Sequence, residues 1–225
     1  MPADQVADGV WLIRGTRTNL AVIDDGGSRC LVDTGYRRDW KRLSAGLEAM
    51  GRGPADVEAV LFTHAHVDHV GNAERLRTEY HAPVHAHEAE AALVRGERCE
   101  RIGTGYMVSR LWWPKMMSFV FTAVRSGGAG HPSVGAVATF GRPDALDLPG
   151  GPVPIFTPGH TSGHCAFHLP DRGVLLSGDA LVTLDALTLR TGPRLLSRAF
   201  NHDQAEAVRS LERLRPLQAE MVLPG

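Results

Sequence analysis

Thr-His-Ala-His-Val-Asp-His-Val-Gly, residues 63–71 of this chain, places three histidines and one aspartate within six residues. In an extended segment the side chains of His64 and His66 project from the same side. Asp68 and His69 follow where the chain must turn to enter a helix. Imidazole and carboxylate are the groups that a divalent ion such as zinc prefers as ligands. The stretch therefore predicts a metal site.

The alternative is a solvated polar loop, or histidines that are hydrogen-bonded inside a core. The apolar run Val57–Phe62 before the cluster is typical of a buried strand. Three imidazoles and a carboxylate at a strand end make a poor core, because each buried polar group needs its own partner. We therefore favour the metal site.

Two later segments supply the ligands that one loop cannot. His160 lies on a glycine-flanked turn in Pro158-Gly159-His160-Thr161-Ser162-Gly163-His164. Asp179 lies in Ser177-Gly178-Asp179-Ala180, directly after another predicted strand. Each segment alone is a weak signal, since single histidines and aspartates are common at strand ends. Together with the first cluster they predict a site for two ions.

Apolar spacing predicts alternating strands and helices along the rest of the chain. Strands are expected at 10–13, 19–23, 30–32, 57–62, 83–86, 152–156, 165–169, 173–176 and 221–223, and helices at 39–50, 71–80, 87–94 and 203–214. Gly51 fits the position after a helix end, and Asn201 is the expected cap of the last helix. That helix would bury Val208, Leu211 and Leu214. The pattern indicates an α/β (α+β) chain with two similar halves around one site.

Residues 96–143 break this pattern and are predicted to be an insertion in a single domain of residues 1–225. We expect a helix near the start of the insertion and a loop-rich second half. Its apolar cluster consists of Trp112, Trp113, Met116, Met117, Phe119 and Phe121. The cluster suits a lid or apolar wall over the metals, a satellite core, or a contact in a homodimer.

The composition is that of an ordinary globular protein. Of the 225 residues 43% are hydrophobic and 22% charged, which excludes a disordered or fibrous chain. The 24 Lys and Arg balance the 25 Asp and Glu, so no net field attracts nucleic acid or anionic membranes. The start Met-Pro-Ala-Asp-Gln shows no export signal, and the three cysteines form no disulfide framework. We therefore expect a cytoplasmic protein without nucleic-acid or membrane partners.

The motifs His-x-His-x-Asp-His, Pro-Gly-His and Gly-Asp, in this order, resemble those of the metallo-β-lactamase superfamily. Asp33 in Leu31-Val32-Asp33-Thr34-Gly35 resembles its early aspartate motif. The resemblance covers the chain except the insertion. It implies a four-layer αββα sandwich with the metals at one edge of two facing sheets. It also implies that His64, His66 and His160 bind the first metal, Asp68 and His69 the second, and Asp179 both, while Asp33 and His164 orient the ligands.

The family pattern also carries a further histidine on a late loop, often directly after Pro-Gly. The sequence runs to Leu223-Pro224-Gly225 and does not include that histidine. Either that histidine follows Gly225 or the protein lacks it. The resemblance implies a full ligand set for the first metal in both cases, and a full set for the second metal only in the first case.

The ligands predict a hydrolase of an ester, thioester, lactone or lactam, whose partner is a small-molecule acyl substrate. Zinc is the expected cofactor, as one or two ions, with iron or manganese as alternatives. A metal-bound water loses a proton near neutral pH, and Asp68 would orient it as the catalytic residue. The metals would stabilise the charge that develops on the acyl oxygen.

Three other functions use similar ligands. A phosphodiesterase or nuclease is disfavoured by the missing basic excess. An iron dioxygenase acting on persulfides would use a mononuclear site, with His64, His160 and Asp179 as a facial triad. A metal-binding scaffold without catalysis is the third alternative.

The remaining chemistry-bearing residues have no motif around them. We expect surface or capping positions for the histidines at 81, 85, 87, 131, 168 and 202. Arg190, Arg194 and Arg198 recur every fourth residue, which favours a solvated face over a grip on a substrate carboxylate or phosphate. Cys165 is expected to be a small buried strand residue.

Overall fold

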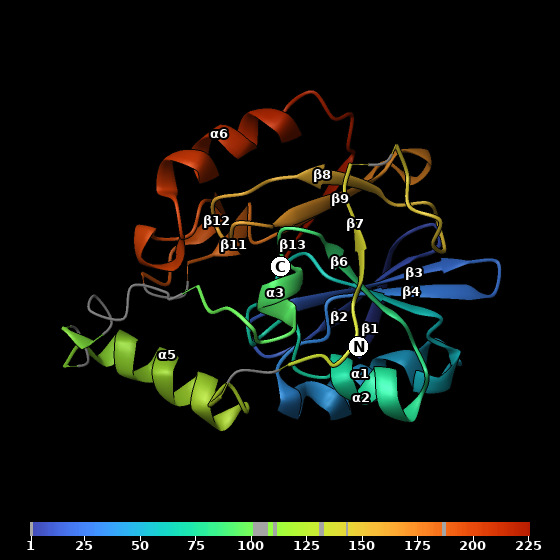
Figure 1. Cartoon of the computed structure of the whole chain (residues 1–225), viewed down its shortest axis with the longest axis horizontal. Coiled ribbons are helices and arrows are strands. Elements are labelled where there is room, and N and C mark those ends of the chain that lie inside the picture. Colours follow the sequence, from blue (N-terminus) through green and yellow to red (C-terminus); the bar gives the residue numbers. More distant parts are fainter. Residues whose placement is uncertain (1, 101–107, 110–111, 131–132, 143, 186–187) are drawn as a thin grey trace.

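The computed structural model describes the chain except residues 1, 101–107, 110–111, 131–132, 143 and 186–187. In the described part, seven strands form one sheet in the order β1 to β7 (Figure 1). They are β1 (Ala3–Ala7), β2 (Val10–Arg14), β3 (Asn19–Asp25), β4 (Ser28–Val32), β5 (Ala59–Leu61), β6 (Val84–His87) and β7 (Ala138–Phe140). The first four strands are antiparallel, whereas β4 to β7 are parallel because helices lie in their connections.

A second sheet contains four described strands in the order β13–β10–β9–β8. They are β8 (Val153–Phe156), β9 (Cys165–Leu169), β10 (Val174–Gly178) and β13 (Met221–Pro224). A separate antiparallel pair joins β11 (Val182–Leu184) to β12 (Thr191–Arg194). The predicted strands are present with small shifts of their ends, while β1, β7, β11 and β12 were not predicted.

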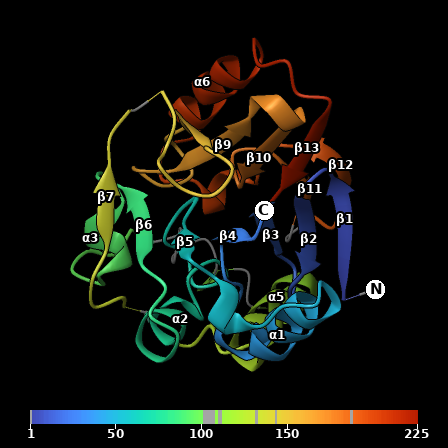
Figure 2. The same cartoon turned by 90° about the vertical axis from the view of Figure 1, so that its right-hand side faces the viewer.

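The two sheets face each other and helices cover their outer sides (Figure 2). Helices α1 (Trp40–Ala49) and α2 (Ala73–Glu79) lie on the seven-stranded sheet, and α6 (Gln204–Leu214) lies on the other. A short helix, α3 (Ala91–Val94), follows β6. The layer order is helix, sheet, sheet, helix, which confirms the αββα sandwich.

Two hydrophobic cores hold these layers together. One packs Leu47 and Leu76 of the helices against Leu31 of β4. The other lies between the sheets and contains Val32 and Phe167, from β4 and β9. Successive strand residues point to opposite faces, so adjacent Leu31 and Val32 serve different cores. This double use explains why the central strands read as continuous apolar runs.

The cap of α6 differs from the prediction. Asp203, not Asn201, precedes the helix, and its carboxylate accepts hydrogen bonds from the backbone N–H groups of Ala205 and Glu206. An aspartate at this position satisfies two N–H groups that have no partner within the helix. The side chain of Asn201 instead forms a hydrogen bond with His160.

The residues that α6 buries also differ in part from the prediction. Val208, predicted to be inside, is 50% exposed, whereas Ala207 and Ser210 are the buried residues of the helix. The end of α1 follows the prediction, because Gly51 adopts the left-handed φ of +71° that a residue after a helix end often requires.

Helix α5 (Pro114–Arg125) is the main element of the segment 96–143. Residues 101–107 and 110–111 near the start of this segment lie outside the described residues, so the helix expected there stays a prediction. Buried Met116 of α5 packs with Val182, Leu196 and Phe200 in a third apolar cluster. The inner side of α5 therefore attaches to the second half of the molecule. The last residues of the segment form β7, which extends the large sheet beside β6.

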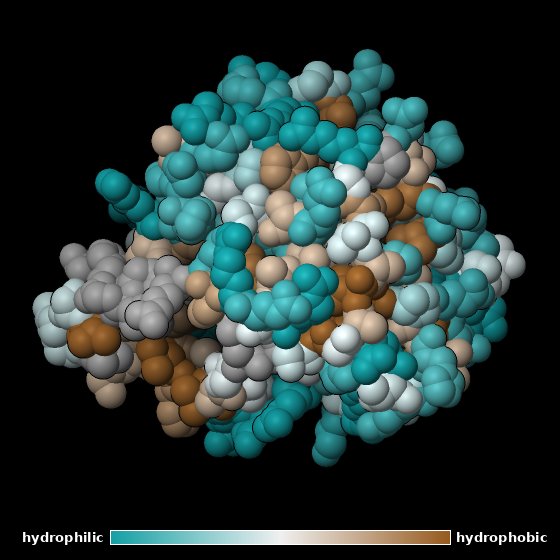
Figure 3. All heavy atoms as spheres, viewed as in Figure 1, coloured by the Kyte–Doolittle hydropathy of each residue, from teal (hydrophilic) through white to brown (hydrophobic). Residues whose placement is uncertain are grey.

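The outer side of α5 is apolar and exposed. Met117, Phe121 and Val124 are 57%, 66% and 54% exposed. Hydrophobic residues gather over this helix in Figure 3. The homodimer contact predicted for this cluster stays a prediction. Among the described residues, no helix is long and apolar enough to cross a bilayer.

Two histidines lie deeper than predicted. His87 and His168 are only 5% and 9% exposed, and His87 stacks on Phe156 with 4.5 Å between ring centroids. Both lie in strands. His87 faces the opposite sheet, whereas His168 lies on the other face of β9, because its neighbours Phe167 and Leu169 face the core between the sheets. His85 is half-buried, His81 and His202 are exposed as expected, and His131 lies outside the described residues.

The arginine series and Cys165 largely follow the predictions. Arg190 and Arg198 are exposed, while Arg194 of β12 is half-buried and donates to the carbonyl oxygens of Thr191 and Gly192. Cys165 is fully buried in β9.

Candidate metal centre

The predicted ligands lie beyond strand ends at one edge of the two sheets. His64 and His66 follow β5, Asp179 follows β10, and His160 lies between β8 and β9. Asp33 follows β4, which runs parallel to β5 and so ends at the same edge. Each half of the molecule therefore contributes to one group of side chains.

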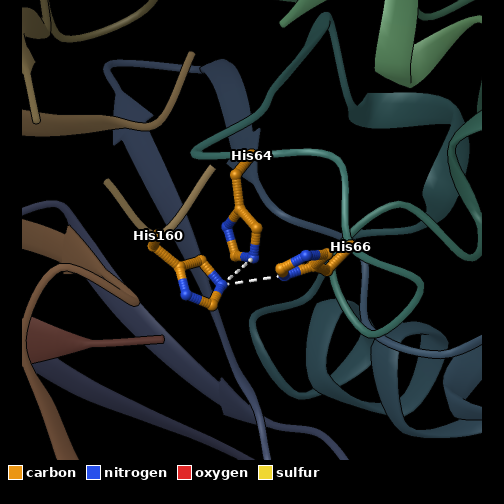
Figure 4. A group of neighbouring side chains, drawn as sticks. All are labelled: His64, His66 and His160. Carbon is orange, nitrogen blue, oxygen red and sulfur yellow. Dashed lines mark hydrogen bonds between the residues drawn. The ribbon is translucent and has the colours of Figure 1, made fainter. Parts of the chain in front are cut away.

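His64, His66 and His160 point toward one another (Figure 4). His160 Nε2 lies 3.2 Å from His64 Nε2 and 2.8 Å from His66 Nδ1. One ring nitrogen of each residue lies within 4.8 Å of the other two. The structure thus brings together the three residues predicted to bind the first metal.

Outer hydrogen bonds decide which nitrogens of His64 and His160 carry a proton. The Thr63 hydroxyl donates to Asp33 Oδ2 at 2.7 Å, so its oxygen accepts from His64 Nδ1 at 3.0 Å. Asn201 Oδ1 accepts from His160 Nδ1 at 3.1 Å, while Asn201 Nδ2 donates elsewhere. Both Nε2 atoms therefore present lone pairs to each other, an arrangement that a cation between them satisfies.

Burial lowers the pKa of His64 well below its usual value and also lowers the pKa of His160. Both rings are therefore neutral near pH 7. Neutral imidazole is the form that binds a metal ion. The donor set fits a divalent cation.

His64, His69 and Asp179 form a second group whose ligand atoms also lie within 4.8 Å of one another. Asp179 Oδ1 lies 3.6 Å from His69 Nε2, and its Oδ2 lies 3.5 Å from His160 Nε2. The Asp179 carboxylate, a member of the second group, therefore also reaches His160 of the first group. Gly225 reaches the same place, since a Cβ built on it would lie 2.5 Å from Asp179 Oδ1.

Two carboxylates, one of them outside the second group, act on His69. Burial alone would lower the pKa of His69, but Asp33 and Asp179 raise it to about 10. Asp33 Oδ2 lies 2.8 Å from His69 Nδ1. A cation bound beside His69 and Asp179 would offset these carboxylate charges.

Asp33 and His164 contact ligand-bearing segments, as the resemblance implied. Asp33 accepts from the backbone N–H and hydroxyl of Thr63 and from His69. His164 Nε2 accepts from the backbone N–H of Asp179 at 3.1 Å, and its Nδ1 lies 2.8 Å from Thr157 Oγ1. Both ring nitrogens of His164 are engaged, so it is placed to orient the Asp179 loop.

Asp68 lies outside both groups but lines the same cavity. This cavity has a volume of about 710 Å³ and is lined by His66, Asp68, His160 and Asp179. Burial raises the pKa of the Asp68 carboxyl and the charge of Asp179 adds to the rise, whereas His69 opposes it. A carboxyl with a raised pKa at the wall of a cavity is a chemically suitable group for proton transfer.

Part of the cavity wall is apolar. Its residues come from α5, β11 and the segment before α6, namely Phe119, Ala123, Val182, Leu184, Leu196 and Phe200. Trp112 and Trp113 are not among its lining residues. Cys99 and Glu100 lie at the wall, as do Arg14, Arg17 and Tyr36.

Sequence reasoning missed three supporting residues. Thr63 and Asn201 orient His64 and His160, and Glu90 is 1% exposed beside the ligand loops. Burial raises the pKa of Glu90 to about 7, against the effect of the donors that surround it. The role of Thr63 could have been predicted from the sequence, since this residue directly precedes the first histidine. Glu90 sits in no motif and only the fold reveals it.

Comparison with known proteins agrees with this geometry. Residues 13–225 match the family described as the metallo-beta-lactamase superfamily. The chain belongs to this superfamily. A metallo-beta-lactamase family protein from Thermus thermophilus has a similar solved structure, with a TM-score of 0.64 and 28% identity. The match covers 92% of this chain and 68% of that one.

Two curated members of the superfamily are also similar. The probable metallo-hydrolase YflN of Bacillus subtilis is 29% identical over 175 residues, which are 75% of this chain and 64% of YflN. The hydroxyacylglutathione hydrolase of Rhizobium meliloti is 47% identical over 47 residues, 20% of this chain and 18% of that enzyme. The chain thus spans less than two thirds of the length of either relative.

Proposed function

We propose that this chain is a zinc-dependent hydrolase of an ester, thioester, lactone or lactam. The observation that carries the proposal is the pair of facing Nε2 lone pairs of His64 and His160 beside a cavity of about 710 Å³. Superfamily membership supports it, and so does the similarity to a probable metallo-hydrolase and a hydroxyacylglutathione hydrolase. A polar floor with an apolar wall suits an acyl compound.

The chain's own residues divide the work at this site. A bound divalent ion would supply Lewis acidity and ease the deprotonation of water. Thr63 and Asn201 bond the Nδ1 atoms of His64 and His160, so the Nε2 lone pairs of both residues would be free to bind such an ion. Asp68 accepts a proton from the attacking water and returns it to the leaving group. The apolar wall holds the acyl chain and excludes bulk water.

The test combines metal analysis with a substrate panel. The protein is purified without added metal, assayed for metals, and divided into zinc-loaded and dipicolinate-treated samples. We expect one or two zinc ions per chain and chelator-sensitive cleavage of at least one member of an ester, thioester, lactone and lactam panel. No cleavage by zinc-loaded protein at any substrate would overturn the acyl-hydrolase proposal.

The same preparation separates the alternatives. One iron per chain with oxygen uptake on a persulfide substrate would replace the hydrolase by a dioxygenase. Turnover of bis-p-nitrophenyl phosphate in preference to acyl substrates would replace it by a phosphodiesterase. Tight metal binding without any turnover would leave a metal-binding scaffold.

The cavity wall makes a prediction about chain length. Phe119 of α5 lines the cavity, whereas Phe121 on the same helix is 66% exposed. Loss of roughly 50 Å² of apolar contact is worth about 1.3 kcal/mol, or about tenfold in binding. Phe119→Ala should therefore raise KM about tenfold for long acyl chains and little for acetyl substrates. Phe121→Ala is the matched control, and equal effects of the two variants would contradict this role for the α5 wall.

A further inference from the structure

Glu90 lies between the two loops that carry the histidines. It directly precedes α3, and its side chain is almost fully buried, with 1% exposure. One loop, residues 63–69, follows β5 of the large sheet, and the other, residues 158–164, joins β8 to β9 of the small sheet. Glu90 belongs to neither loop, and it contacts both.

The carboxylate of Glu90 accepts three hydrogen bonds. Oε1 accepts from the backbone N–H of Ala65 at 2.7 Å, between His64 and His66. Oε2 accepts from the Thr161 hydroxyl at 3.0 Å and the Gly163 backbone N–H at 2.9 Å, on either side of Ser162. Each oxygen therefore holds a different ligand-bearing loop.

The close packing of Gly163 against Glu90 is independent evidence that the loop and this side chain fit each other. A Cβ placed on Gly163 would lie 2.4 Å from the backbone nitrogen of Glu90 and 2.6 Å from its Oε2. Only glycine allows the loop to approach so closely. On its other side the loop is held by Glu100, which accepts from the backbone N–H of Ser162 at 2.9 Å.

We propose that Glu90 is the positioning residue that sets the distance between His64/His66 and His160, and thereby the metal affinity of the first site. The proposal rests on the metal site of the proposed function. All three partners of Glu90 are donors, so both of its oxygens must accept. Glutamine has one accepting oxygen, and in either orientation its NH₂ group faces an N–H or O–H donor.

The chain contains a matched control. Asp39 is also a buried carboxylate, 2% exposed, and accepts three hydrogen bonds. Its donors are the backbone N–H and hydroxyl of Thr16 and the backbone N–H of Tyr36. None of them belongs to a loop that carries a histidine ligand. Asp39→Asn therefore removes the same kind of contact without separating the ligand loops.

Three quantities are measured for each variant. Chelator competition gives the zinc affinity, and the visible spectrum of the cobalt-substituted protein reports the geometry of the metal ligands. The melting temperature of the metal-free protein reports its stability. Glu90→Gln should weaken zinc binding by about 10- to 100-fold and change the cobalt spectrum. Asp39→Asn should lower the melting temperature but leave both metal readouts unchanged. If Glu90→Gln does not fold, Thr161→Val removes a single bond and should weaken zinc binding several-fold.

A Glu90→Gln protein that is destabilised like Asp39→Asn, yet binds zinc as tightly as the wild type, would overturn the positioning role. These readouts need no substrate. Wild-type protein that binds zinc but hydrolyses nothing overturns the proposed function alone, whereas wild-type protein that binds no metal overturns both.

Discussion

His64 illustrates how one side chain is prepared by its neighbours. Thr63 holds its Nδ1 proton, and Asp33 in turn accepts from Thr63. Asp33 adopts a left-handed φ of +62°, which costs a non-glycine residue roughly 1–2 kcal/mol. The hydrogen bonds to Thr63 and His69 offset that cost. At the scale of single residues, the candidate metal site is thus a set of imidazoles that are oriented by hydrogen bonds from the residues around them.

The three cysteines differ in reactivity for physical reasons. Burial raises the pKa of Cys30 to about 12 and raises the pKa of Cys165 as well, whereas Cys99 is exposed and lines the cavity. Because the thiolate is the reactive form, native protein should react with one equivalent of a thiol reagent such as DTNB, and denatured protein with three.

The control for this prediction is Cys99→Ser, which should show no fast-reacting thiol. Reaction of Cys30 or Cys165 at the rate of Cys99 in native protein would contradict the buried positions of β4 and β9.

The loop before β9 shows how an element positions a ligand. Helix α6 lies against this loop: the backbone N–H of Asp203 donates to the Gly159 carbonyl at 2.8 Å, and the Ser210 hydroxyl donates to the Pro158 carbonyl at 2.6 Å. Gly159 has a φ of +126°, and a Cβ on it would lie 2.2 Å from the backbone nitrogen of Ala207. His160 is therefore placed by the docking of α6.

Gly159→Ala should separate this loop from α6. The strained φ and the backbone clash predict a loss of about 3 kcal/mol or more in unfolding free energy, together with weaker zinc binding. Urea denaturation of the metal-free protein measures the first effect.

Gly151→Ala is the comparison, because Gly151 also has a positive φ, +54°, but a Cβ there meets no atom within 4 Å. It should lose about 1 kcal/mol. Equal losses for the two variants would show that the approach of α6 to the loop is not the cause.

At the scale of the whole molecule, the core between the sheets connects the two halves. Strands β4 and β5 face β9 and β10 across it, and Phe167 is fully buried there. The metal groups lie at the edge of this core and take ligands from both halves. Loss of packing between the sheets therefore acts on both the fold and the site.

Phe167→Ala should lower the unfolding free energy by about 3–5 kcal/mol, because it leaves a cavity between the sheets. The urea m-value should stay unchanged and the unfolding should remain one transition. Phe121→Ala, at an exposed position, should change stability by less than about 0.5 kcal/mol. Two transitions in Phe167→Ala would mean that the halves unfold separately.

Local sequence determined the features that depend on neighbours in the chain. The periodicity predicted most strands and helices, and the histidine cluster with the two later segments predicted the ligand candidates. The sandwich itself was implied by the resemblance of the motifs to the superfamily. The apolar α5 cluster was visible too, although the prediction left lid, satellite core and dimer contact open. Its inner side proved to be a satellite core and, through Phe119, a cavity wall.

Other features depended on residues that meet only after folding. Asn201 is a residue type that often caps helices, but Asp203, two residues later, caps α6. The Asn201 side chain instead accepts a hydrogen bond from His160, 41 residues away in the sequence. His87 and His168 carry no signal of burial in the local sequence. His87 is covered by Phe156 of the opposite sheet, whereas His168 is buried on the other face of its own sheet, since its neighbours Phe167 and Leu169 face the core between the sheets. Glu90 gains its role from donors 25 to 73 residues distant. Side-chain periodicity is a local property of the chain, whereas ring orientation and cavity shape arise from contacts across both sheets, so only the tertiary structure could decide them.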